Sequence, residues 1–98
     1  MPRNFQVVAL KFEIIVKWRT GNSGGMLQIF FIEYRNRFES EWNVITAEGK
    51  TSEVIDGLQM GTVYFVRMFS RNILGDSNKT DEILIKTGRY SITIYFGF

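Results

Sequence analysis

The sequence predicts an all-β fold in which seven antiparallel strands form two facing sheets. Apolar residues recur at every second position in short runs, and almost no segment repeats at the period of a helix. Glycine, asparagine and aspartate separate these runs at the spacing of turns in a two-sheet sandwich. The chain of 98 residues is long enough to bury one hydrophobic core, so we expect a single sandwich domain.

The first two predicted strands are residues 4–10 and 12–18. The first follows Pro2 and is expected at the edge of a sheet. In the second, alternate apolar side chains share one face, which places Trp18 in the core. The residues on that face are Phe12, Ile14, Val16 and Trp18.

The third predicted strand, residues 28–35, is expected to be central in its sheet. Its alternation puts one face in the core and leaves the other in water. The core-facing residues are Phe30, Ile32 and Tyr34, and the outer ones are Phe31, Glu33 and Arg35. A flexible glycine-rich loop at 21–25 precedes this strand, and charged residues at 35–40 connect it to a short fourth strand at 42–45.

The remaining predicted strands are residues 51–55, 64–72 and 81–87. The longest, 64–72, follows a leucine, a glycine turn and a tyrosine, which are Leu58, Gly61 and Tyr64. A buried tyrosine must place its hydroxyl against a hydrogen-bond partner. We therefore expect the Tyr64 side chain to hold the start of this strand in place.

The order and spacing of these residues resemble those of a fibronectin type III domain over residues 4–87. The matching residues are Trp18, Phe30, Ile32, Tyr34, Leu58, Tyr64, Val66, Met68, Ser70, Asn72, Gly75 and Ser77. The resemblance implies a seven-stranded, immunoglobulin-like sandwich in which the tyrosine hydroxyl bonds to backbone near the leucine. Four residues are then structural: Trp18, Tyr34, Leu58 and Tyr64. The domain is expected at residues 1–88, with a C-terminal extension at 89–98.

Cysteine and histidine are absent, which excludes disulfides, zinc ligation by sulfur or nitrogen, and imidazole catalysis. The neighbouring carboxylates, Glu39 with Glu41 and Asp81 with Glu82, lie in polar connecting segments that offer no raised pKa. The alternation of oxygen ligands from Asp76 to Glu82 lacks the glycine and the final bidentate carboxylate of a calcium loop. We expect no catalysis, no cofactor and no metal.

The outward-facing residues of the third, sixth and seventh strands form an unusually aromatic and basic surface. They are Phe31, Glu33, Arg35, Phe65, Arg67, Phe69, Arg71, Leu84 and Lys86. Exposed aromatic residues interleaved with arginine are typical of protein-recognition hot spots. The candidate partner-binding residues are Phe31, Arg35, Phe65, Arg67 and Phe69. In the alternative interpretation, they form ordinary cross-strand pairs beside an ion pair of Glu33 and Arg67. Nucleic acid is disfavoured, because glutamates interrupt the basic residues.

The loop at 73–78 leads into a motif for modification. Asn78, followed by Lys79 and Thr80, forms an N-glycosylation sequon, so Asn78 is a candidate glycosylation site. Residues 74–77 are similar to the Arg-Gly-Asp tripeptide that some fibronectin modules present to integrins, but the arginine is missing and integrin binding is not expected. Trp42 stands alone, without the Trp-Ser-x-Trp-Ser signature of cytokine receptors.

The resemblance implies a non-catalytic module for protein-protein interaction and spacing in a larger cell-surface receptor or adhesion protein. The run at 24–35 is similar to modules of immunoglobulin-superfamily adhesion receptors, which implies an extracellular location and a protein partner. The alternative is an intracellular structural repeat of a muscle-type scaffold protein. No apolar run approaches the roughly 20 residues of a membrane span, so no membrane insertion by this segment is expected. Residues 1–10 lack a signal-peptide core, so a secreted form would be part of a longer polypeptide.

The apolar residues 89–98 lie beyond the point where the resemblance ends. Tyr90, Ile92, Ile94 and Phe96 alternate with more polar residues, which is typical of a strand. Four interpretations stay open: an eighth strand, a cover for the aromatic outer face, the start of an interdomain or membrane-proximal segment, or a sequence foreign to the domain. A free segment of this composition would favour aggregation.

Overall fold

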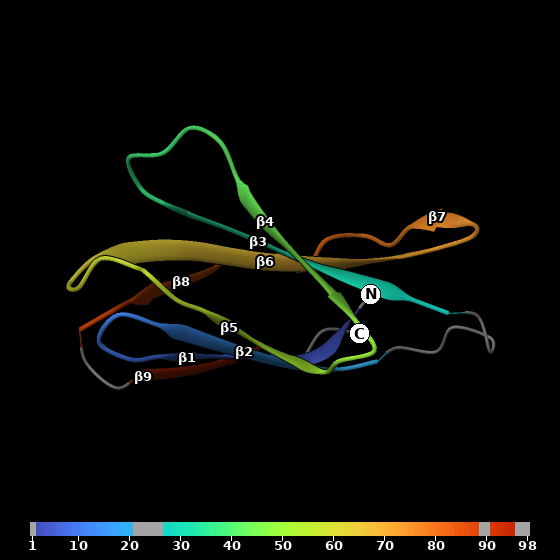
Figure 1. The fold of residues 1–98 in the computed structure, drawn as a ribbon, viewed down its shortest axis with the longest axis horizontal. Helices are drawn as coiled ribbons and strands as arrows, with labels where there is room; N and C mark the ends of the chain where they lie inside the picture. The colour runs from blue at the N-terminus through green and yellow to red at the C-terminus, as the bar shows by residue number, and fades with distance from the viewer. Residues whose placement is uncertain (1, 21–26, 89–90, 96–98) are drawn as a thin grey trace.

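Two antiparallel β-sheets face each other in the computed structural model, which describes residues 2–20, 27–88 and 91–95 (Figure 1). The strands in these ranges are β1 (Arg3–Ala9), β2 (Ile14–Arg19), β3 (Ile29–Asn36), β4 (Asn43–Glu48), β5 (Ser52–Ile55), β6 (Val63–Asn72), β7 (Gly75–Asp76), β8 (Ile83–Lys86) and β9 (Ser91–Tyr95). Over the same ranges, no helix has the length and apolar character needed to cross a membrane. The predicted all-β sandwich is confirmed, although the described residues form nine strands and not the predicted seven.

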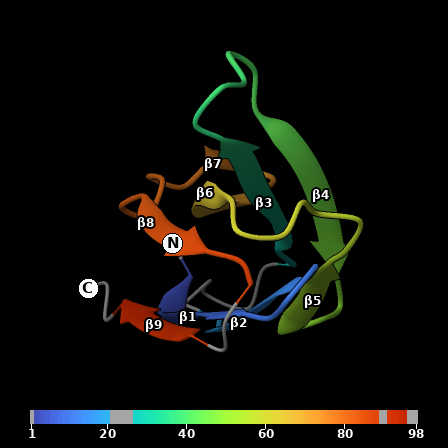
Figure 2. The same cartoon turned by 90° about the vertical axis from the view of Figure 1, so that its left-hand side faces the viewer.

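The two sheets have different strand orders. One has the order β5-β2-β1-β9, and the other has β4-β3-β6-β7, with β8 also pairing with β6. Figure 2 shows the sheet of β5, β2, β1 and β9 below the sheet that contains β4, β3, β6 and β8. The third predicted strand is central, as expected, because β3 pairs with β4 on one side and with β6 on the other.

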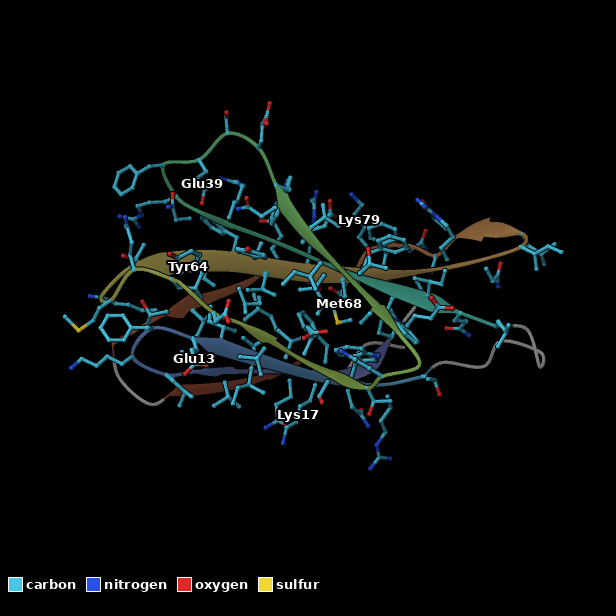
Figure 3. The ribbon with its side chains drawn as sticks, in the orientation of Figure 1. Glu13, Lys17, Glu39, Tyr64, Met68 and Lys79 are labelled. Carbon is cyan, nitrogen blue, oxygen red and sulfur yellow. The ribbon has the colours of Figure 1, made fainter. Side chains whose placement is uncertain are left out.

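The core lies between the sheets and is built by alternation along each strand. Its fully buried members include Phe5, Val7, Ala9, Ile14, Val16, Ile32, Val66 and Met68. Met68 is labelled between the two sheets in Figure 3. Trp18 is 3% exposed, and its ring is tilted against Phe30 with 5.5 Å between the ring centres. The predicted burial of Trp18 is therefore confirmed.

The Tyr64 side chain fastens the connection between the sheets. The backbone N–H of Gln59 donates a hydrogen bond of 3.0 Å to the Tyr64 hydroxyl, one residue after the buried Leu58. Gly57 and Gly61 flank this bond with φ angles of 67° and 65°, a conformation that side chains with a Cβ rarely adopt. The expected bond from the tyrosine hydroxyl to backbone near the leucine is present.

Several details of the predicted strands are wrong. The first strand does not lie at the edge of its sheet, because β1 pairs with β2 on one side and with β9 on the other. Phe12 is 50% exposed and precedes β2, because the chain turns there and the backbone N–H of Leu58 donates to the Phe12 carbonyl. The fourth strand extends to Glu48, because β3 continues to pair with β4 as far as Ile29. The loop at 73–78 also contains the short strand β7, and the predicted loop at 21–25 lies outside the described residues.

Part of the C-terminal segment adds a strand to the sandwich. β9 pairs antiparallel with β1, from Phe5 opposite Tyr95 to Ala9 opposite Ser91. β9 belongs to the sheet that does not carry the aromatic outer face, so it is not a cover for that face. Residues 89, 90 and 96–98 lie outside the part of the chain that the structure describes.

Thr87 anchors the chain just before this added strand. Its hydroxyl accepts a hydrogen bond from the Thr62 N–H and donates one to the Gln59 carbonyl. Its backbone N–H and carbonyl pair with Thr62 and Gly61, and the N–H of Gly88 donates to the Leu10 carbonyl. These bonds tie the end of β8 to both neighbouring loops, independently of β9.

Candidate protein-binding face

The outer side of the sheet formed by β4, β3, β6 and β8 carries a connected layer of aromatic and basic side chains. Strand register sets it up: Phe31 is opposite Phe69, Glu33 is opposite Arg67, and Arg35 is opposite Phe65. Directly opposed residues in an antiparallel pair point to the same face, so these pairs form successive rows. We call this surface the aromatic-arginine face; it comprises Phe31, Arg35, Trp42, Phe65, Arg67, Phe69 and Arg71.

Two arginines stack on the ring of Trp42. The guanidinium carbon of Arg67 lies 3.8 Å from the centre of the indole, and that of Arg35 lies 4.9 Å from it. Arg35 is also 4.7 Å from the ring centre of Phe65. A guanidinium over an aromatic ring is attracted by the negative potential of the ring face. Trp42 and Phe65 therefore hold the two arginines in fixed positions along the sheet.

Glu33 sits between two cations at the centre of the face. Its carboxylate is 2.9 Å from the Arg67 Nε and 2.9 Å from the Lys79 Nζ, and its side chain is only 11% exposed. Arg67 also lies 3.5 Å from Glu82. A carboxylate with so little access to water is stable when paired with opposite charges. The centre of the face is consequently a charge-balanced network.

A second aromatic pair lies beside this network. The rings of Phe31 and Phe69 stack at 4.9 Å with 8° between their planes. Arg71 covers Phe31 at 4.6 Å, and Lys79 covers Phe69 at 5.3 Å; Lys79 is labelled on the outer side of the sheet in Figure 3. Phe69 is consequently only 8% exposed. Arg71 also forms hydrogen bonds of 2.6 and 3.2 Å to Asp76, which hold the pKa of that carboxyl below its usual range.

Comparison with solved structures of the same architecture identifies the fold. The FN1-FN3 domains of chicken CNTN1 match with a TM-score of 0.81 and 20% identity, over 90% of this chain and 32% of that one. The FN5 domain of Drosophila Lar matches with a TM-score of 0.72 and 19% identity, over 88% of this chain and 92% of that one. The chain has the fibronectin type III fold. A further neighbour, described as a myokine structure, matches with a TM-score of 0.77 and 24% identity, over 90% of this chain and 96% of the other.

A curated protein shows sequence similarity to this chain. Protein turtle of Drosophila melanogaster is 32% identical over 90 residues, which cover 88% of this chain. The chain spans only 6% of the length of that relative. No protein-family model matches the sequence.

The fibronectin type III fold brings all five predicted partner-binding residues onto one surface. It also pairs them with one another, so the ion pair of Glu33 and Arg67 and the pair of Phe31 and Phe69 are both present. Trp42 completes the face but was not among the predicted residues. The sequence does contain a signal for Trp42: it lies directly before β4, where the pairing of Tyr34 with Asn43 brings it next to Arg35 of β3.

Each edge strand of the face carries an exposed aliphatic residue. Leu84 on β8 is 59% exposed beside Phe65, and Val44 on β4 is 54% exposed beside Glu33. Lys86 is exposed at the end of β8. Exposed aliphatic residues around a paired charge network provide surface that a protein partner can cover.

The sequon at Asn78 lies beside this face. Asn78 is exposed, and its carbonyl accepts a hydrogen bond from the Ser77 hydroxyl. Thr80 is buried, because its hydroxyl accepts a hydrogen bond from the Met68 N–H and its own N–H donates to the Met68 carbonyl. The acceptor asparagine is thus accessible, while the sequon threonine is part of the sandwich.

Glu39, which was predicted to lie in a polar connecting segment, has a structural role. It accepts hydrogen bonds from the Asn36 N–H at 3.0 Å and from the Asn43 side chain at 3.1 Å. These donors lower the pKa of Glu39 and hold the connection between β3 and β4, where Figure 3 labels it. Burial raises the pKa of Tyr34, which packs against the core. Among the residues described, no group of acidic side chains is arranged to hold a metal ion.

Proposed function

We propose that this domain is a non-catalytic module for protein-protein interaction and spacing in the extracellular part of a cell-surface receptor or adhesion protein. The aromatic-arginine face is the binding surface, with Phe31, Arg35, Phe65, Arg67 and Phe69 as its partner-binding residues. The observation that supports it most is the connected layer of arginines stacked on Trp42 and Phe65. Aromatic and arginine side chains held in this way lose little conformational entropy on binding.

A protein partner suits the shape of this face better than a small molecule does. Small ligands bind in concave sites that enclose most of their surface. Two hollows in the described part of the chain, of about 340 and 240 Å³, share Gln28 in their linings and include none of the residues of the aromatic-arginine face. An open sheet surface with exposed aliphatic residues at its edges is suited to contact with another protein surface.

The binding proposal is tested with the 98-residue chain coupled as a multimer to fluorescent beads and applied to intact cells. Phe65→Ser and Arg35→Ala should each reduce cell binding by about tenfold or more, the loss typical of a hot-spot residue. Val54→Ser, at a 45% exposed residue on the other sheet, is the matched control and should leave binding unchanged. Equal binding by the Phe65 and Val54 variants would contradict the proposal.

The extracellular location is tested through Asn78. We expect the chain, expressed behind a secretion signal in a eukaryotic host, to carry a glycan that Asn78→Gln removes without changing the melting temperature. Asn78→Gln is the suitable variant, because Thr80→Ala would also remove a buried hydrogen bond. A secreted chain without a glycan would instead favour the intracellular structural repeat as the alternative function.

We also propose that the domain comprises residues 1–88 and that residues 89–98 are an extension. The hydrogen bonds of Thr87 and Gly88 support this boundary, since they fasten the end of the sandwich without any contribution from β9.

A further inference from the structure

The addition of β9 moves the edge of one sheet outward. β9 pairs with β1 on one side, and no described strand pairs with its other side. Every second backbone N–H and carbonyl of an edge strand points away from the sheet. The outer side of β9 is therefore a row of hydrogen-bonding groups that another extended strand can complete.

β9 lacks the features that normally keep a sheet edge from pairing. Natural edge strands carry charges, prolines or bulges that prevent contact with another chain. Each of the other outer strands includes a charged residue: Glu48 in β4, Glu53 in β5, Asp76 in β7 and Lys86 in β8. Ser91–Tyr95 has neither a charge nor a proline, and three of its five residues are β-branched. Its composition favours strand pairing.

The sequence of β9 is also nearly symmetric about its centre. Reading outward from Thr93, isoleucine occurs on both sides, at Ile92 and Ile94. If two copies of this strand pair antiparallel about a two-fold axis through Thr93, each threonine is opposite a threonine and each Ile92 is opposite an Ile94. Both are favourable cross-strand pairs. This symmetry favours a second copy of β9 as the partner over an unrelated strand.

We propose that β9 pairs with β9 of a second copy of this chain, giving a two-fold symmetric dimer with one continuous sheet across both copies. A self-complementary contact of this kind closes after two subunits. Strand register places four residues in one row across the sheet, and the last of them lies in the contact strand: Val54, Ile15, Val8 and Ile92. The contact lies on the sheet opposite the aromatic-arginine face, so dimer formation and the proposed partner binding are independent of each other.

Sedimentation velocity of the 98-residue chain over a wide range of concentration tests this dimer. We expect the mass of one chain at low concentration and of two chains at high concentration. Three double variants probe the register. Ile92→Lys with Ile94→Lys places lysine opposite lysine at both pairs across the two-fold axis. Ile92→Glu with Ile94→Glu places glutamate opposite glutamate. Ile92→Lys with Ile94→Glu places opposite charges together.

The first two variants should dimerise at least about tenfold more weakly than the original chain, since like charges directly opposite are destabilising. Mixing them should restore a dimer, and the third variant should dimerise alone. All three replace the same two isoleucines, so any weakening of the pairing between β1 and β9 is shared and does not produce this pattern. The proposal would be overturned if the chain is a monomer at every concentration, or if the three double variants associate equally well.

Discussion

Replacing Tyr64 by phenylalanine isolates one hydrogen bond of this fold. Tyr64 is 3% exposed, and its hydroxyl accepts the Gln59 N–H at 3.0 Å. Tyr64→Phe keeps the buried ring and removes the acceptor. The net stabilisation from one such bond is about 1 kcal/mol. Gln59 is exposed, so water can reach part of the released N–H and the loss should stay near this value. In a domain of this size, about 1 kcal/mol corresponds to a decrease of roughly 4–8 °C in melting temperature.

Tyr34→Phe is the matched control for this experiment. Tyr34 also packs against the core, but among the residues described its hydroxyl makes no hydrogen bond that phenylalanine would remove. The two variants therefore differ chiefly in the bond to Gln59. Thermal and chemical denaturation should show Tyr64→Phe clearly less stable than Tyr34→Phe. Equal losses of stability would refute the idea that the tyrosine hydroxyl fastens the connection between the sheets.

Three further changes test the core, the aromatic-arginine face and the turn at Glu39. Trp18→Ala should lower the free energy of unfolding by about 3–5 kcal/mol by leaving a cavity, and a nearly unchanged denaturation midpoint would contradict its placement. Phe69→Ser should destabilise the domain by about 2–4 kcal/mol, because Phe69 is buried beneath Phe31 and Lys79. Phe65 is only half-buried, so Phe65→Ser should destabilise the domain clearly less. A reversed order of the two variants in denaturation experiments would contradict this packing. The pKa of Glu39 is lowered from its ordinary value of 4.5 in the folded chain, so its contribution to stability is present above that value and is lost as the pH falls through the lowered pKa. Glu39→Gln should therefore reduce the acid dependence of stability, measured by denaturation between neutral and low pH; an unchanged pH profile would argue against the hydrogen bonds of this carboxylate.

The burial of Phe69 changes how the face is tested. The sequence places Phe69 on the outer side of the sheet, where a double change of Phe65 and Phe69 to serine is expected to remove binding and leave stability nearly unchanged. In the structure, stacking on Phe31 encloses Phe69 within the outer layer itself. Loss of binding in a Phe69 variant could consequently come from a lost contact with the partner or from lost stability of the domain. Phe65 and Arg35 separate recognition from stability better.

The strand pattern and its two faces follow from the sequence by itself. Alternation decides which side chains of a strand share a face, because successive side chains point in opposite directions. This was enough to predict the buried Trp18 and the outer position of the five candidate binding residues. That the buried hydroxyl of Tyr64 needs a hydrogen-bond partner is also predictable from the residues, whereas the position of this partner near Leu58 was implied by the resemblance to fibronectin type III domains.

Only the tertiary structure decided which strands are neighbours and what covers each outer residue. Alternation contains no information on strand register across a long connection, so the stacking of Arg67 on Trp42 was not predictable. The burial of Phe69 was not predictable either, because it depends on Lys79, which lies in the connection between β7 and β8. The strand character of β9 was visible in its residues, but its place beside β1 depends on which sheet edge is free to accept backbone hydrogen bonds.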